Sequence, residues 1–138
     1  MPHPDGLPDL FLDRSLGRVT VPRLLRDEGL RLVSLAERYG VPQDESISDE
    51  RWLREAGERG EAVLMKDARV RYNPAEKAAV LRYRVRCFCL VRRDLTAEAM
   101  ADRFLRNLNA MSRACDSPGP FLYIVHERRI VRAPLEWT

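Results

Sequence analysis

Short apolar runs alternate with helical patterns along most of the chain, and this alternation restricts the possible folds more than any other feature. Apolar runs of strand length lie at 10–12, 30–35, 62–65, 85–91 and 121–125. A further short run at 129–132 is expected to pair with the run before it as a hairpin. Strands that alternate with helices predict an α/β fold, a three-layer sandwich around a mainly parallel sheet.

The helices between these runs carry recognisable start and stop signals. Ser48 is a good N-cap for a helix that begins at Asp49, and Gly60 ends it. The sequence Asn73-Pro74-Ala75-Glu76 starts another helix with a cap, an N1 proline and an N3 acid. The longest helix is expected over 97–115, and residues 41–47 are expected to form an exposed loop.

Composition indicates one globular domain over 10–138, preceded by a loose leader at 1–9. No run of about 18–20 apolar residues could cross a bilayer, and the leader lacks the apolar segment of a signal peptide. We therefore expect a cytoplasmic protein without membrane contacts, in which Cys87, Cys89 and Cys115 stay reduced and buried. The net charge of +3 fits an anionic partner such as nucleic acid, and it fits an arginine-rich soluble surface equally well.

Three acids are expected at one edge of the sheet. Asp13 follows the first strand, Asp67 follows the third, and Asp49 begins the helix that leads into the third strand. In a parallel α/β sheet, strands end and the following helices begin at the same edge, so these carboxylates converge. Converging carboxylates repel one another, and Mg²⁺, which prefers carboxylate and water oxygens, relieves that repulsion.

Four basic residues near these acids could hold a phosphate backbone: Arg14, Lys66, Arg69 and Arg71. Each residue also has a plainer interpretation. Asp13 and Asp49 are common helix-capping residues, and lysines and arginines are usually solvated. The coincidence of three acids at one edge is what favours a functional site.

Asp13 after LFL, Asp49 in SDERWL and Asp67 in VLMKD resemble the PIN-like nucleases, in particular the PIN-like toxins of bacterial VapBC toxin–antitoxin pairs. The resemblance extends from about Leu10 to Val91. It implies a Mg²⁺- or Mn²⁺-dependent ribonuclease whose metal-binding acids are those three aspartates. It also implies an RNA substrate, a cognate antitoxin protein and a homodimer.

The sequence departs from the family pattern in two places. The further acid that PIN nucleases usually carry has only Glu37, Asp44 or Glu45 as candidates here. Residues 68–70 replace an acid and an aromatic residue that many relatives have after the last aspartate. A non-catalytic PIN-like module that binds RNA or protein is therefore the alternative. A phosphoacceptor receiver domain ranks lower, because the fourth strand offers neither the Thr or Ser nor the Lys that it needs.

Overall fold

The computed structural model describes residues 3–66, 73–91 and 94–135. A six-stranded sheet in the order β2-β1-β3-β4-β5-β6 forms its centre. The first five strands are parallel, and β6 pairs with β5 in the antiparallel direction. The strands are β1 (Leu10–Leu12), β2 (Leu32–Ser34), β3 (Ala62–Lys66), β4 (Arg86–Leu90), β5 (Phe121–Val125) and β6 (Ile130–Ala133).

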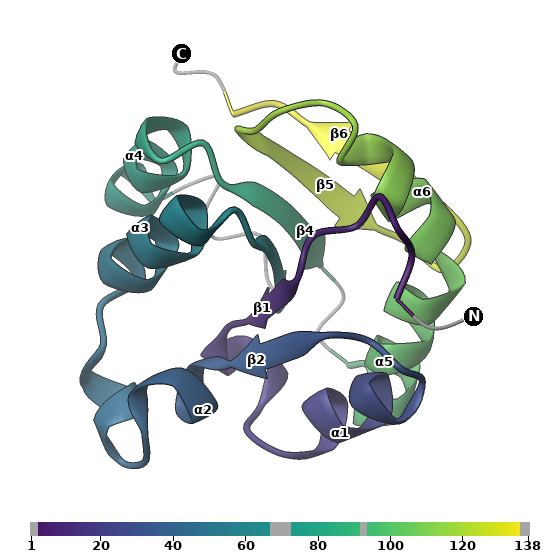
Figure 1. Ribbon diagram of the computed structural model, residues 1–138, viewed down its shortest axis with the longest axis horizontal. Helices are drawn as coiled ribbons and strands as arrows, with labels where there is room; N and C mark the ends of the chain where they lie inside the picture. Colours follow the sequence, from purple (N-terminus) through teal and green to yellow (C-terminus); the bar gives the residue numbers. More distant parts are fainter. Residues whose placement is uncertain (1–2, 67–72, 92–93, 136–138) are drawn as a thin grey trace.

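Helices cover both faces of this sheet, so the predicted α/β three-layer sandwich is confirmed (Figure 1). The helices are α1 (Thr20–Asp27), α2 (Leu35–Tyr39), α3 (Asp49–Arg59), α4 (Pro74–Arg82), α5 (Ala97–Arg106) and α6 (Leu108–Ala114). Two short 3-10 helices complete them, η1 (Arg14–Leu16) and η2 (Gln43–Ser46). Among the described residues, no helix is long and apolar enough to cross a membrane.

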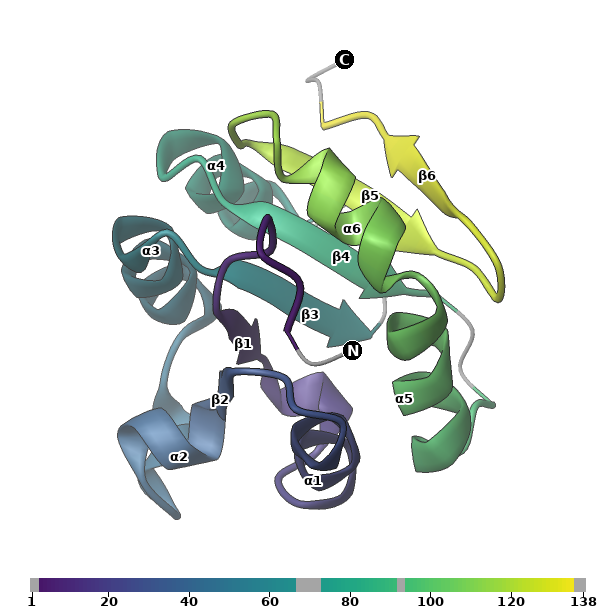
Figure 2. The same ribbon diagram turned by 45° about the vertical axis from the view of Figure 1, so that its right-hand side comes forward.

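The alternation of side chains along the strands divides the core in two. Leu10 and Leu12 pack on the face covered by α1, α5 and α6, whereas Phe11 packs on the face covered by α2, α3 and α4. Figure 2 shows α3 and α4 on one side of the sheet and α1, α5 and α6 on the other. Both faces of the parallel strands are therefore buried, as is usual for a sheet of this type.

Three expectations about local structure need correction. The helix predicted over 97–115 is interrupted at Asn107, which separates α5 from α6. The segment 41–47 contains η2 rather than only an exposed loop, and the Asp44 side chain is buried. The leader packs on the body, because Leu7 is buried and His3 Nδ1 accepts a hydrogen bond of 3.0 Å from the backbone N–H of Arg31.

Candidate functional site

Two of the three predicted acids lie at the carboxyl edge of the sheet. Asp13 directly follows β1 and caps η1, and its backbone N–H donates to the Leu64 carbonyl at 3.2 Å. Asp49 is the first residue of α3, behind the N-cap Ser48, whose hydroxyl accepts a bond from the Arg51 N–H at 3.1 Å. Asp67 lies outside the described residues, one position after Lys66 at the end of β3.

Ser15 joins the ends of β1 and β3. Its backbone N–H donates to Asp13 Oδ1 at 3.1 Å, and its hydroxyl donates to the same oxygen. The hydroxyl oxygen in turn accepts the backbone N–H of Lys66 at 2.9 Å. One side chain therefore fixes the Asp13 carboxylate and the backbone that leads to Asp67. The sequence offered one signal for Ser15, a serine two positions after an aspartate, which is a common local turn.

The environment of Asp13 favours its protonated form. Burial raises the pKa of Asp13 to about 7, and the negative charge of Asp49 adds to the increase. The two hydrogen bonds from Ser15 and the charge of Arg14 act in the opposite direction. With a pKa near 7, Asp13 is about half-ionised at neutral pH, and a cation bound beside it would favour the ionised form.

Asp49 lies in a different environment. Its Oδ1 accepts bonds from Arg14 Nη1 and Trp52 Nε1, each at 2.9 Å. Burial raises the pKa of Asp49, but side-chain hydrogen bonds with Glu76 and Trp52, together with Arg14, outweigh burial and leave it below its usual value. Two neighbouring carboxyl groups thus have pKa values pushed apart, which is frequent at functional sites.

Arg14 holds the segment before α3 as well as Asp49. Its Nη2 donates to the carbonyl of Asp44 at 3.1 Å and to that of Ile47 at 2.6 Å. Because three of its bonds are internal to the protein, Arg14 positions Asp49 relative to η1. Its role as a phosphate ligand stays a prediction. Lys66 is partly buried at the end of β3, and Arg69 and Arg71 lie outside the described residues.

The three candidates for a further acid are all near arginines. Glu37 accepts two bonds from Arg26, Asp44 accepts two from Arg18, and Glu45 lies 3.3 Å from the same Arg18. These contacts hold the pKa of Asp44 below its usual range, chiefly through the hydrogen bond from Arg18.

Glu76, in the first turn of α4, is the acid that meets Asp49. The sequence analysis identified Glu76 only as a helix-capping residue. Its proximity to Asp49 depends on how α3 packs against α4, which sequence periodicity does not specify.

The donor atoms at this edge suit a hard divalent cation. Asp13 and Asp49 supply carboxylate oxygens, and burial disfavours the ionised form of Asp13, which a bound cation would stabilise. Such oxygen ligands are those that Mg²⁺ and Mn²⁺ prefer. Within residues 3–66, 73–91 and 94–135, no group of three His, Cys, Asp or Glu side chains is spaced to hold a metal ion.

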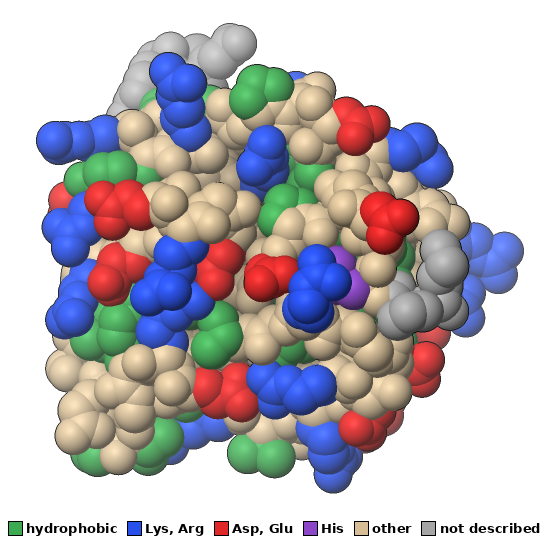
Figure 3. All heavy atoms as spheres, in the orientation of Figure 1, with side chains coloured by type: hydrophobic (Ala, Val, Ile, Leu, Met, Phe, Trp, Pro, Cys, Tyr) green, Lys and Arg blue, Asp and Glu red, His purple; other side chains and the backbone are tan. Residues whose placement is uncertain are grey.

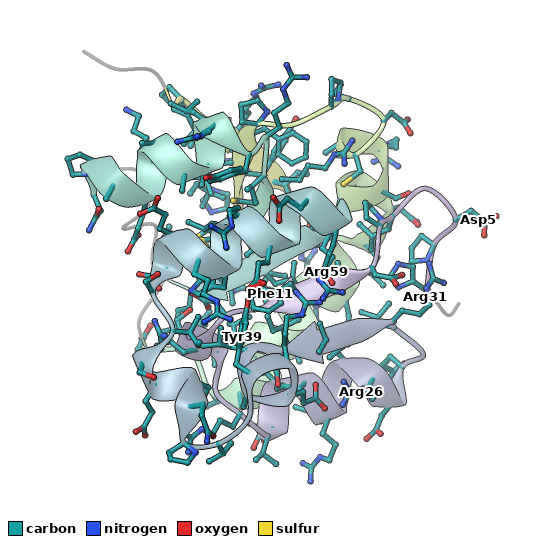
Figure 4. The ribbon with its side chains drawn as sticks, turned by 60° about the vertical axis from the view of Figure 1, so that its left-hand side comes forward. Asp5, Phe11, Arg26, Arg31, Tyr39 and Arg59 are labelled. Carbon is teal, nitrogen blue, oxygen red and sulfur yellow. The ribbon has the colours of Figure 1, made fainter. Side chains whose placement is uncertain are left out.

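A second polar region lies at the opposite edge of the sheet, in a depression of about 410 Å³. Figure 4 labels Arg26, Arg31 and Arg59, which reach this region from α1, from the segment before β2 and from the end of α3. Most of its positive charge is compensated. Arg31 pairs with Asp9 at 2.7 Å, and Arg26 pairs with Glu37 at 2.8 Å.

The pairing of charges extends beyond that depression. Basic and acidic side chains are interspersed over the face of the molecule seen in Figure 3. The buried pair Arg38–Glu61, which also lines the depression, joins α2 to the start of β3. A largely neutralised set of arginines at the edge opposite Asp13 is better explained as structural than as a site.

Comparisons with known proteins give a consistent result. A family model described as "PIN like domain" matches residues 8–92, which contain Asp13, Asp49 and Asp67. The chain is also similar to a Mycobacterium tuberculosis protein (strain ATCC 25618 / H37Rv) named "Putative ribonuclease VapC45". The two are 46% identical over 126 residues, which is 91% of each chain. No solved structure matches.

Proposed function

The chain belongs to the PIN-like domain family, and from this premise we propose that it is a metal-dependent endoribonuclease, the toxin of a type II toxin–antitoxin pair. One observation supports the proposal. Asp13 and Asp49 both lie at the carboxyl edge of a parallel sheet, near enough for the charge of Asp49 to raise the pKa of Asp13, and Ser15 ties Asp13 to the strand end that leads to Asp67. The similarity to a protein named as a VapC ribonuclease supports the same activity.

We propose Asp13, Asp49 and Asp67 as the ligands of Mg²⁺ or Mn²⁺. A cation held there would supply a Lewis acid for a phosphate oxygen and an activated water for in-line attack. Ser15 holds the Asp13 carboxylate by two hydrogen bonds, so its oxygens are fixed before any ligand arrives. Arg14 of η1 and Trp52 of α3 both donate to Asp49 Oδ1, and these two hydrogen bonds orient the ionised carboxylate.

The remaining roles follow from position and charge. Lys66, Arg69 and Arg71 come at or just after the end of β3, where their side chains would neutralise the phosphates on either side of the cleaved bond. Arg14 would add positive charge beside the phosphates from its half-exposed guanidinium, which also holds Asp49 in position. A cognate antitoxin would neutralise the activity, and we propose a cytoplasmic homodimer as the active form.

The test is RNA cleavage by purified, antitoxin-free protein with Mg²⁺ or Mn²⁺. We expect cleavage that EDTA abolishes, and no cleavage by the separate variants Asp13→Asn, Asp49→Asn and Asp67→Asn. Asp27→Asn is the matched control, because Asp27 is an exposed aspartate in the last turn of α1. Intact RNA in every metal, from folded protein that still binds RNA, would instead identify the non-catalytic PIN-like module.

A further inference from the structure

The turn between β5 and β6 lies at the same edge of the sheet as Asp13. β5 is parallel to β4, and β4 and β1 are both parallel to β3, so the carboxyl ends of all four strands meet there. β1 and β5 are three strand spacings apart in the sheet order. At about 4.8 Å per spacing, the turn is roughly 14 Å along the edge from Asp13. A nucleic acid strand a few nucleotides long covers that span.

A buried side chain holds this turn in place. The His126 N–H donates to the Arg129 carbonyl at 2.8 Å, which closes a tight turn with Glu127 and Arg128 at its tip. Asn107, only 3% exposed, donates from its amide to the carbonyls of His126 at 2.9 Å and of Arg103 at 2.8 Å. The interruption between α5 and α6 thus places Asn107 against the turn, and Figure 2 shows the turn beside that junction.

The turn presents positive charge that the described residues do not compensate. Arg128 and Arg129 are exposed, and neither has an ion pair or side-chain hydrogen bond within the described ranges. Glu127 is 3.9 Å from Arg106, which is also paired with Asp102 at 2.7 Å. The arginines at the opposite edge are mostly paired, whereas these two are available to an anionic ligand at the edge that carries Asp13.

We propose that Arg128 and Arg129 bind phosphates of the RNA strand a few nucleotides away from the cleaved bond, so that the RNA crosses the carboxyl edge from Asp13 to the β5–β6 turn. This proposal rests on the proposed ribonuclease function. A guanidinium is weakly hydrated and matches phosphate oxygens with a planar pair of donors, which suits it to this contact. The anchor at Asn107 holds the backbone of the turn that carries the two arginines, so they would align the strand as well as attract it.

The test compares Arg128→Ala/Arg129→Ala with the wild type on an unstructured RNA at several salt concentrations. Each phosphate contact to a single strand contributes a slope of about 0.7 in log affinity against log salt. Loss of two contacts should lower affinity about 25-fold at 0.1 M salt and about 7-fold at 0.25 M. We expect KM to rise by these factors with kcat unchanged, and the cleavage of a dinucleotide, too short to reach the turn, to be unaffected.

The matched control is Arg54→Ala/Arg59→Ala, which removes the same charge from exposed positions on α3. It should change KM and the salt slope much less. If the turn variant keeps the wild-type KM and slope, or if both variants lose affinity equally, the proposal is overturned. If wild-type protein cleaves no RNA, the ribonuclease function fails instead, and RNA affinity in EDTA still tests the two arginines. A variant that binds RNA normally but loses an acidic protein partner would also overturn it.

Discussion

Asp13→Asn should stabilise the metal-free protein at alkaline pH. The pKa of Asp13 in the folded protein is about 7, against an ordinary value of 3.8. Because the folded state holds the proton more tightly, this group stabilises the fold at low pH, and that contribution is lost as pH rises from about 4 to about 7. Asparagine has no charge to bury, and its oxygen can still accept the bonds from Ser15.

The magnitude follows from the shift. About three pKa units at 1.36 kcal/mol each give an upper limit of about 4 kcal/mol. Asp13 is only partly buried, so solvent screening should reduce this to about 2 kcal/mol, or roughly 6 °C in Tm for a chain of this size. Thermal melts in EDTA at pH 8 and pH 4 measure it. We expect the variant to melt higher at pH 8 and nearly equally at pH 4.

The exposed Asp27→Asn is the control for a general loss of one negative charge, and it should change Tm little at either pH. The reasoning would be refuted if Asp13→Asn lowered Tm at pH 8, or if its effect were the same at both pH values. Either result would mean that the Asp13 carboxylate is adequately solvated or paired in the folded protein.

Three further predictions concern the same regions. Mn²⁺ affinity should rise about tenfold from pH 6 to pH 8, because Asp13, with a pKa of about 7, must lose its proton before it binds the metal. Calorimetry in two buffers should count about half a proton released per Mn²⁺ bound at pH 7, and an affinity that does not change with pH would contradict this. Ser15→Ala leaves the Lys66 N–H without its partner, so it should lower the free energy of unfolding by about 1–2 kcal/mol and weaken Mn²⁺ binding. Ser15→Thr should keep most of the stability and most of the metal affinity. Equal metal affinity in the wild type and both variants would contradict the prediction. Gly57→Ala places a Cβ 2.5 Å from the Tyr83 carbonyl oxygen, so urea denaturation should show a free energy of unfolding lower by about 1–3 kcal/mol, even though alanine has the better helix propensity. Glu58→Ala, at an exposed position, should change the free energy of unfolding very little.

The fold could be predicted because local signals and the global architecture agree. The strand Ala62–Lys66 consists of a continuous apolar run, 62–65, followed by a lysine, as expected for a parallel strand buried on both faces, and Ser48 and Asn73 cap the helices that were predicted at those positions. The break at Asn107 could not be predicted. Its apolar neighbours keep the helical period across the break, and the bond from Asn107 to the carbonyl of His126, 19 positions further along the chain, is a contact that local sequence does not reveal.

The approach of Asp13 to Asp49 could also be predicted, because strand direction alone brings their segments to one edge. The partners of these acids could not. Arg14, for which phosphate binding stays a prediction, also binds Asp49 and two carbonyls of the protein, and these contacts depend on the path of residues 44–47. Glu76 reaches Asp49 only through the packing of α3 on α4.

The central claim is that Asp13, Asp49 and Asp67 together hold one divalent cation. The most direct measurement is a crystal structure of the protein grown with Mn²⁺, with anomalous difference density collected for manganese. We predict one strong peak with carboxylate oxygens of all three residues at about 2.0–2.3 Å. A peak elsewhere, or three carboxylates that point away from one another with no peak between them, would contradict the claim.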